Sequence, residues 1–539
     1  MLLLLLACAA DSEGRRLPWP SRDEPAADDS SPSSDSEPRD SQDSPGLAYP
    51  DRGLYGIKGL QPDFWSDMDE ISGNAAGGVA MNLVWAFWEP TESLAPCSGD
   101  EVEHQGHCFT VDANVDAAIQ AWTERGLVVT AVVYGVPDWA RAGVDCSPVA
   151  AGFEMFCAPD DPRDYARFAG MLAARYDGSA GHGRVADFVI HNEVNSNNWF
   201  DVGCGQGTPC DKGRWLSTYA DNYWAASDAV LAEQPQAKVF LSLDHHFSNS
   251  FQDLDAESPL LGGEDVIEAV ASEAAGRDWR VAYHPYPPDL LDSEFGPDDW
   301  PRVTYGNLGT LLGWLHAEHP GTVAAREVHL TESGVNSLSP SSQSEQATAL
   351  CDSFQNVLGT PGIESYIYHR MQDHPAETGA GLGLGLRDTT GAAKAAWTTW
   401  ALANRETEGH PQMECGFEDL PFVRLTRGYR SSEGHRASTR VLPSGYAQEQ
   451  SFLLHREEQA DTALLFECLV GAHTLLTRDP DCEGLHPMGP VGWAWTEERS
   501  GSVPLYRCAI GAGADHFVSK EPGCEGQTTE ELLGWVLPG

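Results

Sequence analysis

Two glutamates could carry acid–base chemistry, because each one follows a short apolar segment. Glu193 ends "FVIHNE", beside Asn192, and Glu332 ends "EVHLTE". Two carboxyl groups that face one site can divide a reaction between them, with one donating a proton and the other attacking carbon or holding a water molecule. The pair therefore predicts a catalytic site, provided that the fold brings the two segments together.

Other polar side chains follow apolar segments in the same way. Asn192 could hydrogen-bond a sugar 2-hydroxyl. Tyr286 or His284, in "AYHPYPPDL", could hold Glu332 ionised and oriented. We also expect substrate-binding or supporting roles for Asn195, His245, His369 and Arg370. This set of side chains matches what cleavage of a glycosidic bond requires.

The segments that position these residues alternate between strand and helix patterns from residue 50 to residue 408. Helical stretches such as "NVDAAIQAWTERG" have apolar residues three and four positions apart. Eight strand–helix units predict an α/β fold, a (β/α)8 barrel over residues 49–408. A doubly wound sheet is the alternative, but it would usually carry a Gly-rich phosphate turn after the first strand, and "GIKGLQPDF" is not one. The expected strands cover residues 54–60, 79–85, 127–134, 187–191, 238–243, 280–284, 327–332 and 365–369.

In such a barrel, the residues at the carboxyl ends of the strands share one mouth. Glu193 follows the fourth expected strand and Glu332 ends the seventh, so both should face the same site. Aromatic residues at strand ends could stack on sugar rings, although most aromatic residues of a barrel only pack its core. We expect sugar contacts among Trp85, Trp139 and Trp199.

Two further motifs carry less weight. "DHH" at 244–246 could suggest a metal, but histidines at strand ends are more often hydrogen-bonded site residues. "GAGLGLGL" at 379–386 lacks the ending of a phosphate-binding loop. We therefore expect no metal and no cofactor.

The charge of the chain excludes several partners. It has 81 acidic against 33 basic residues, for a net charge of -48. Nucleic-acid binding needs a basic face, so no nucleic-acid partner is expected. A strongly acidic surface commonly keeps an exported protein soluble. We expect a monomer with a carbohydrate substrate.

The N-terminus resembles a shortened lipoprotein signal. Residues 1–8 read "MLLLLLAC", with Cys8 as the expected lipidated residue. The apolar run is far below the ~20 residues of a membrane span. It is also short for a signal and lacks a preceding basic residue, so a mis-assigned start or a cytosolic N-terminus is the alternative. Residues 9–48 are rich in Asp, Glu, Ser and Pro and predict a disordered linker. A lipid-anchored protein at the cell surface, or an extracellular one, is expected.

The other 12 cysteines fall mostly into close neighbours. Even pairing outside any metal-ligand spacing favours disulfides and an oxidising compartment. The expected pairs are Cys97 and Cys108, Cys146 and Cys157, Cys204 and Cys210, Cys468 and Cys482, and Cys508 and Cys524, with Cys351 and Cys415 remaining as the sixth.

Residues 415–539 no longer alternate between strand and helix patterns, and they contain three similar segments. These are "FVRLTRGYRSSEGHRAST", "LFECLVGAHTLLTRDPDCEG" and "LYRCAIGAGADHFVSKEPGCEG", with His435, His473 and His516 at matching places. Three short β-rich repeats predict a small β-trefoil-like domain, a candidate for binding glycan or cell wall. The repeat histidines are interpreted as buried residues that hydrogen-bond turns, in preference to ligand contacts.

The motifs of the barrel also resemble a known group. "HNEVN", "HPY" and "LTESG" look like the retaining glycoside hydrolases of clan A, whose catalytic glutamates lie on strands four and seven. The resemblance implies Glu193 as acid/base, Glu332 as nucleophile, and Asn192, His284 and Tyr286 as supports. Many clan members carry an Arg on strand two, where this chain has "VAMNLVWAFWEP". Arg370 could act from strand eight instead.

A closer resemblance is to an uncharacterised bacterial family within that clan. It rests on "IHNEVNSNNW", "HPYPPD", "TYGNLGTL", "LTESGVNS" and "IYHRMQDHP", and it covers residues 50–400. This family brings no settled substrate, so it adds only fold and class. The C-terminal repeats separately resemble bacterial secreted repeat domains with an "HF" core motif.

Three functional hypotheses follow. The first is an extracellular retaining glycoside hydrolase for β-linked poly- or oligosaccharides, with a carboxyl separation of roughly 5–5.5 Å. The second is a carbohydrate-binding or adhesion lipoprotein on an inactive scaffold. The third is a transglycosylase, which would use the same residues and differ in how well the acceptor site excludes water.

Overall fold

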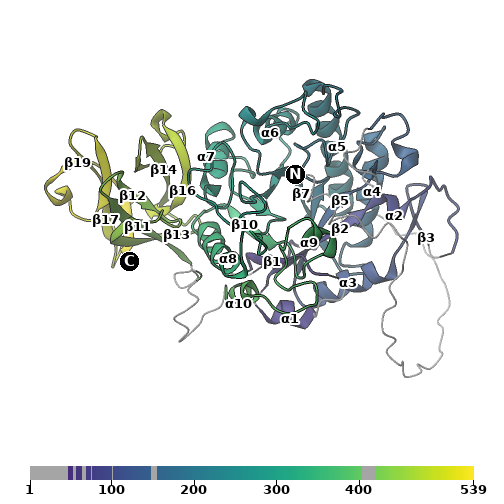
Figure 1. Cartoon of the computed structure of the whole chain (residues 1–539), viewed down its shortest axis with the longest axis horizontal. Coiled ribbons are helices and arrows are strands. Elements are labelled where there is room, and N and C mark those ends of the chain that lie inside the picture. Colours follow the sequence, from purple (N-terminus) through teal and green to yellow (C-terminus); the bar gives the residue numbers. More distant parts are fainter. Residues whose placement is uncertain are drawn as a thin grey trace.

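The chain forms a parallel α/β barrel followed by an all-β domain, and the two lie side by side (Figure 1). The structure is a computed structural model that describes residues 47–52, 56–63, 68–74, 76–99, 101–146, 154–403, 415 and 421–539. The predicted signal with Cys8, and the predicted linker up to residue 46, lie outside the described residues.

Eight parallel strands close the barrel in the order β1-β10-β9-β8-β7-β6-β5-β2. This confirms the predicted (β/α)8 fold, and each expected strand corresponds to one observed strand. The first is shorter than expected, because β1 begins at Lys58. The strands are β1 (Lys58–Leu60), β2 (Gly78–Val84), β5 (Val128–Tyr134), β6 (Val185–Ile190), β7 (Lys238–Asp244), β8 (Arg280–His284), β9 (Val328–Leu330) and β10 (Ile363–Tyr368).

The helices around the barrel each bury an apolar stripe against the strands. In α4, Pro162 occupies the first turn and the side chain of Asp161 accepts a hydrogen bond from the N–H of Arg163, which caps the helix. Phe168 and Leu172 of this helix are fully buried. The helices are α1 (Met68–Gly73), α2 (Trp85–Trp88), α3 (Ala113–Glu124), α4 (Pro162–Arg175), α5 (Lys212–Glu233), α6 (Gly263–Ser272), α7 (Leu308–Glu318), α8 (Gln343–Leu358), α9 (Pro375–Gly379) and α10 (Ala395–Leu402).

A hairpin of β3 (Glu101–His104) and β4 (His107–Thr110) follows α2. It lies on the side of the barrel that faces away from the all-β domain (Figure 1). Nδ1 of His107 lies 2.9 Å from Oε1 of Glu89, a buried residue just after α2. Trp85 donates to the other carboxylate oxygen of Glu89 at 2.9 Å. The hairpin is thus tied to the end of β2.

A buried ion pair closes the amino end of the barrel. Asp187, near the start of β6, is fully buried, and Arg52 donates to its Oδ2 at 2.6 Å. The hydroxyls of Tyr49 and Thr130 donate to the same carboxylate at 2.8 and 3.1 Å. Burial raises the pKa of Asp187, but the charges of Arg52 and His329 outweigh it and leave that pKa below its usual value. The carboxylate is therefore ionised and holds the chain segment before β1 against the barrel.

The C-terminal domain contains three successive units of a long, a short and a long strand. The short strands β12, β15 and β18 contact one another. Leu425, Leu465 and Leu505, one from the first strand of each unit, are fully buried in a common core. The strands are β11 (Phe422–Arg430), β12 (Gly434–Ser438), β13 (Ala447–His455), β14 (Thr462–Val470), β15 (His473–Thr477), β16 (His486–Trp495), β17 (Val503–Ile510), β18 (Asp515–Ser519) and β19 (Thr528–Pro538).

The histidines at matching places of the three segments lie close together in this domain. Nδ1 of His435 is 2.6 Å from Oδ2 of Asp515, and Nε2 of His473 is 2.9 Å from Nδ1 of His516. All three imidazoles are largely buried. The three imidazoles are thus buried and hydrogen-bonded, but to other side chains of the domain, where the interpretation expects turns.

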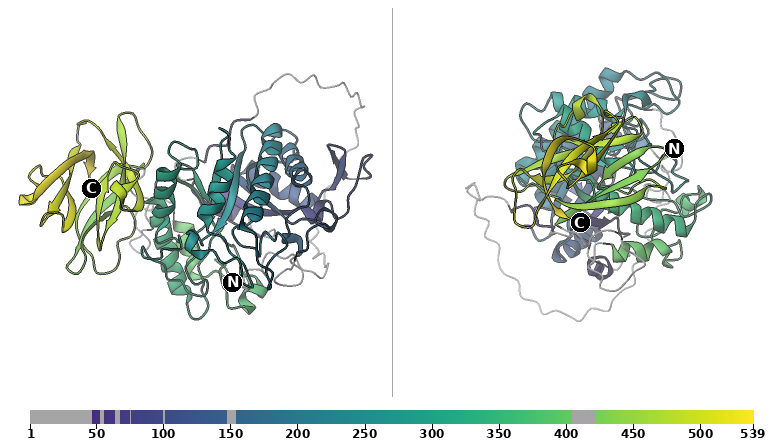
Figure 2. Two further views of the ribbon diagram at one scale, coloured as in Figure 1. Left: turned by 90° about the horizontal axis from the view of Figure 1, so that it is seen from above. Right: turned by 90° about the vertical axis from the view of Figure 1, so that its left-hand side faces the viewer.

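The two domains pack through α7 and β16, which are labelled next to each other in Figure 1, and the left view of Figure 2 shows the all-β domain against one side of the barrel. A Cβ at Gly309 would lie 2.0 Å from the carbonyl oxygen of Met488, so glycine allows the helix to approach the strand closely. The side chain of Asn356, from α8, accepts a hydrogen bond from the N–H of Val441 at 2.8 Å. Backbone contacts of this kind fix how the domains sit against each other.

The structure contains six disulfides, which join all of the predicted pairs: Cys97–Cys108, Cys146–Cys157, Cys204–Cys210, Cys351–Cys415, Cys468–Cys482 and Cys508–Cys524. Disulfides persist in oxidising compartments, so they indicate a secreted or extracellular protein. Within the described residues, no helix has the length and apolar character needed to cross a bilayer.

The ion pair at the amino end of the barrel generates a prediction of stability. Asp187→Ala would leave the guanidinium of Arg52 without its main partner, and we expect the free energy of unfolding to fall by about 3 kcal/mol or more. Denaturant unfolding followed by tryptophan fluorescence measures it. The matched control is Asp228→Ala, whose pair with Arg277 is exposed, with an expected change below about 1 kcal/mol. Equal effects of the two variants would contradict the prediction.

Candidate active site

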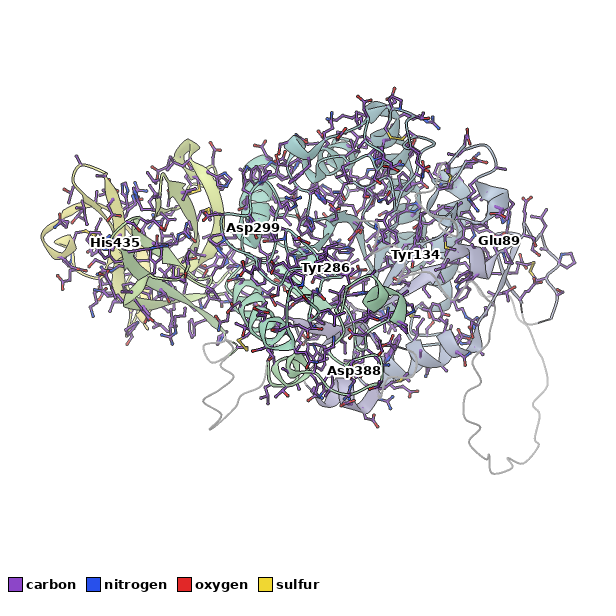
Figure 3. All side chains as sticks on the ribbon, in the orientation of Figure 1. Glu89, Tyr134, Tyr286, Asp299, Asp388 and His435 are labelled. Carbon is purple, nitrogen blue, oxygen red and sulfur yellow. A yellow bond between two sulfur atoms is a disulfide. The ribbon has the colours of Figure 1, made fainter. Side chains whose placement is uncertain are left out.

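Four neighbouring strands bring the candidate residues to one mouth. Glu193 follows β6, Asp244 ends β7, His284 ends β8, and Glu332 follows β9. Because neighbouring strands run parallel, their carboxyl ends meet at the same end of the barrel. Tyr286, labelled in Figure 3, lies near the middle of the barrel in this view.

Glu193 is held by groups from β7 and β8. Its backbone N–H donates to Oγ of Ser242 at 3.0 Å, and its φ of 40° lies in the left-handed region that side chains other than glycine rarely adopt. Oε1 of Glu193 lies 2.8 Å from Nδ1 of His284. The side chain is almost wholly buried. The local turn therefore aims the carboxyl group of Glu193 inward, toward β8.

The environment of Glu193 favours its protonated form. Burial raises the pKa of Glu193 to about 6, and the negative charges of Asp244 and Glu332 act in the same direction. The hydrogen bond from His284 opposes this shift only in part. A carboxyl group with a pKa near 6 can hold a proton in mildly acid solution and lose it during a reaction.

Glu332 has a different partner. The hydroxyl of Tyr286 donates to Oε1 of Glu332 at 2.9 Å, and burial raises the pKa of Tyr286 well above its usual value, so the phenol remains a donor. Of the two partners expected for Glu332, Tyr286 makes the contact. The expectation for His284 needs correction, because its Nδ1 pairs with Glu193 and its Nε2 lies 3.1 Å from Oγ1 of Thr331.

The two catalytic candidates are close. One carboxylate oxygen of Glu193, one of Glu332 and one ring nitrogen of His284 all lie within 4.8 Å of one another. Among the described residues, this is the group of acidic and histidine side chains that is compact enough to hold a metal ion. Oε1 of Glu193 also contacts His284, and Oε1 of Glu332 accepts from Tyr286, so both carboxyl groups are held in an arrangement suited to proton transfer.

Two further side chains of the mouth have polar atoms without protein partners in the described structure. Asn192 is buried, and its Oδ1 accepts no hydrogen bond. His245 is also buried, and its Nδ1 has no partner. Burial lowers the pKa of His245 to about 3, with a contribution from His246, so its ring is neutral. Because buried polar atoms are rarely left unpaired, both are candidates for contact with a ligand.

Asn195 supports the site from within the protein. Its Nδ2 donates to Oδ1 of Asp244 at 2.5 Å, and its Oδ1 accepts from the N–H of Asp244 at 3.0 Å. The side chain thus joins the loop after β6 to the end of β7. This assigns Asn195 a supporting role and not a direct contact with substrate.

The expected aromatic platforms differ in burial. Trp85 is fully buried, with Phe168 and Trp139 around it, so its ring belongs to the core. Trp199 is buried against Phe156, with ring centroids 4.6 Å apart. Trp139 is partly buried and donates to the carbonyl oxygen of Glu89 at 3.0 Å. Of the three, Trp139 is the one that is not fully enclosed by protein.

His369 and Arg370 connect the end of β10 to the loop after β1. Nδ1 of His369 lies 2.6 Å from Oε1 of Gln61, and Arg370 donates to Oδ1 of Asp63 at 2.6 Å. Nη1 of Arg370 is also 3.5 Å from a carboxylate oxygen of Glu377. These contacts join both residues to the loop after β1, and Arg370 also to α9.

Residues that sequence reasoning left out of the site hold the candidates in place. Ser242 accepts a hydrogen bond from the backbone N–H of Glu193, and Oγ1 of Thr331 contacts Nε2 of His284. Oδ2 of Asp244 lies 2.8 Å from Nδ1 of His246. Thr331 and Asp244 adjoin predicted site residues at strand ends, and that position is the signal by which they could have been found.

Comparison with known proteins assigns the chain to a family. Residues 50–414 match a family of unknown function (DUF5722), and the chain belongs to that family. No protein with a curated description matches the chain. A solved structure of a family 39 glycoside hydrolase from the gut symbiont Bacteroides cellulosilyticus WH2 is 11% identical, with a TM-score of 0.45, over 90% of this chain and 81% of that chain.

Two further solved structures are similar to the same degree. A glucosidase from Croceicoccus marinus is 14% identical with a TM-score of 0.43, over 67% of this chain and 68% of that chain. A GH5_18 protein from Streptomyces cattleya, in complex with Manb1-4GlcNAc, is 17% identical with a TM-score of 0.40, over 66% of this chain and 82% of that chain. At these values the likenesses carry no argument, and the chemistry is inferred from the site itself.

The burial of Glu193 generates a prediction about pH and stability. Its pKa of about 6 in the folded protein exceeds the usual value of 4.5, so ionising it opposes folding. That cost is absent below pH 4.5, grows as the pH rises, and is complete above pH 6. Glu193→Gln should therefore raise the free energy of unfolding above pH 6 by up to about 2 kcal/mol, and leave it unchanged below pH 4.5. Chemical denaturation across this range measures the difference, and one that is independent of pH would contradict the prediction.

Proposed function

We propose that this protein is a retaining glycoside hydrolase that cleaves β-linked poly- or oligosaccharides. The observation that carries the proposal is the close, buried pair of Glu193 and Glu332 at the mouth of the barrel, with oxygen atoms within 4.8 Å. Retaining enzymes need two carboxyl groups about 5–5.5 Å apart, because the nucleophile must reach the anomeric carbon directly. Inverting enzymes need a wider gap that admits a water molecule.

The environments of the two carboxyl groups support different roles. Glu193, with its raised pKa, protonates the glycosidic oxygen as the bond breaks. Glu332, oriented by the hydroxyl of Tyr286, attacks the anomeric carbon and forms a glycosyl–enzyme intermediate. Glu193 then accepts a proton from water, which attacks the same carbon and releases Glu332.

The supporting residues follow from the same cycle. When Glu193 gives up its proton, the hydrogen bond from His284 stabilises the carboxylate that forms. The pKa of His284 is raised: its burial acts against the shift, and Glu193 and Glu332 outweigh that effect. Asn192, with its unpaired Oδ1, is available to a sugar hydroxyl next to the reacting carbon.

The rest of the chain suits a protein that works outside the cell. Six disulfides favour an oxidising compartment, and we propose a lipid anchor at Cys8. We further propose that the C-terminal domain holds glycan or cell wall close to the barrel, because it packs directly on α7 and α8. The protein acts as a monomer in this proposal.

The proposed roles predict different kinetic defects. Glu193→Gln should lower kcat/KM by about 10²–10⁴-fold on natural oligosaccharides, whose leaving groups need a proton, and much less on aryl glycosides with acidic phenols. Glu332→Ala should lose turnover on both. Reducing-sugar release on a panel of β-glucans, mannans, xylans, galactans and microbial exopolysaccharides identifies the substrate first, and aryl glycosides then separate the roles.

Two controls make this test decisive. Glu294→Gln removes an exposed carboxylate from the segment that follows β8, and it should leave activity unchanged. Proton NMR of the first product reports its anomeric configuration, and retention is expected. Inversion would overturn the retaining mechanism, and sugar release that survives Glu332→Ala would overturn the proposed nucleophile. Tight sugar binding without hydrolysis would instead favour a binding protein, and chain lengthening at high sugar concentration would favour a transglycosylase.

A further inference from the structure

A third carboxyl group lies in the mouth of the barrel, and the proposed reaction does not use it. Asp244 ends β7 and is the parallel-sheet neighbour of His284 at the end of β8. The loop after β6 lies along the same strand, since the N–H of Val194 donates to the carbonyl oxygen of Ser242 at 3.1 Å. Asp244 is thus placed between the segment that carries Glu193 and the strand that carries His284.

The carboxyl group of Asp244 is fully engaged by protein donors. Oδ1 accepts from Nδ2 of Asn195 at 2.5 Å and from the N–H of His246 at 2.9 Å. Oδ2 lies 2.8 Å from Nδ1 of His246. Asp244 is 8% exposed. These three contacts hold the carboxylate in a fixed position.

The same contacts keep Asp244 ionised. Burial raises the pKa of Asp244, but the charge and hydrogen bonds of His246, with a contribution from His245, leave it well below its usual value. A carboxylate that accepts several hydrogen bonds is stabilised in its charged form. The site therefore contains one permanent negative charge. It lies beside two carboxyl groups whose charge must change during the proposed reaction.

The groups around Glu193 determine where its proton resides. His284 from β8, Asp244 from β7, Glu332 after β9 and the phenol of Tyr286 all act on it electrostatically. Asp244 and Glu332 oppose its ionisation, and Asp244 also favours the protonated form of His284. Of the two carboxylates, Glu332 loses its charge when it bonds to the sugar, whereas Asp244 keeps its charge throughout.

We propose that Asp244 is a positioning residue whose fixed negative charge keeps a proton on the hydrogen-bonded Glu193–His284 pair. The inference rests on the proposed role of Glu193 as acid/base. Asp244 acts through that pair and does not touch the substrate. Asn195 and His246 hold its carboxylate in a fixed position, so its charge favours protonation of the pair before the sugar binds and again when the pair takes a proton from the attacking water.

The test separates the effect of the charge of Asp244 from the effect of the shape of its side chain. Asp244→Asn keeps the size of the side chain and an oxygen for Asn195 and the N–H of His246, but it removes the charge. Infrared spectra of the full-length protein are recorded across a pH range, and the spectra of the matching Glu193→Gln variant are subtracted from them. The difference isolates the carboxyl band of Glu193, whose midpoint of titration is measured without substrate. The midpoint should move to lower pH by about 1 unit, and the alkaline limb of kcat/KM should move equally.

Two further variants separate charge from position. Asp244→Glu restores the charge and should return the midpoint toward that of the wild type. Asn195→Ala removes the two hydrogen bonds to Asp244 but leaves the charge of Asp244, so it should lower kcat with a smaller shift of the midpoint. Asp244→Ser provides a second neutral variant if Asp244→Asn does not fold.

The outcomes are distinct. A folded neutral variant with an unmoved midpoint would overturn the inference. Equal shifts in Asp244→Asn and Asp244→Glu would also overturn it, because shape and not charge would then be responsible. A moved midpoint in a protein that hydrolyses no glycan would support the electrostatic role of Asp244 while overturning the proposed hydrolase.

Discussion

Closure of eight parallel strands is the constraint on which the rest of this structure depends. The strands all run in one direction, so every loop at their carboxyl ends opens onto the same mouth. Glu193 and Glu332 lie far apart in sequence, yet the closed sheet brings an oxygen of each within 4.8 Å. The pair of Arg52 and Asp187 holds the other end of the barrel closed. One end thus serves stability while the other remains free for chemistry.

The site gathers negative charge, although the chain already carries a large excess of it. Glu193, Glu332 and Asp244 are all buried near one another, and burying like charges together is costly. The structure meets this cost in three ways. Glu193 has a raised pKa beside His284, Glu332 accepts a hydrogen bond from Tyr286, and Asp244 is surrounded by donors from Asn195 and His246. Three carboxyl groups in one mouth therefore have three different environments.

The C-terminal domain extends the barrel on one side. Its contacts with α7 and α8 combine close backbone approaches with side-chain contacts, such as Gly309 against Met488, Asn356 against Val441 and His316 against Phe466. Close backbone contacts leave little freedom between the two parts. The domain therefore stays at a constant distance from the mouth of the barrel.

The sequence alone determined the order of the strands, the fold class, the six disulfide pairs, and the placement of two glutamates at one mouth of the barrel. Those features depend on local patterns: apolar periodicity, cysteine spacing, and polar residues directly after strands. Tertiary structure alone decided how the side chains pair. Nδ1 of His284 hydrogen-bonds Glu193, Trp85 lies in the core, and Arg370 donates a hydrogen bond to Asp63. Pairing depends on the tilt of neighbouring strands and on the turn at Glu193, which no single segment of sequence specifies.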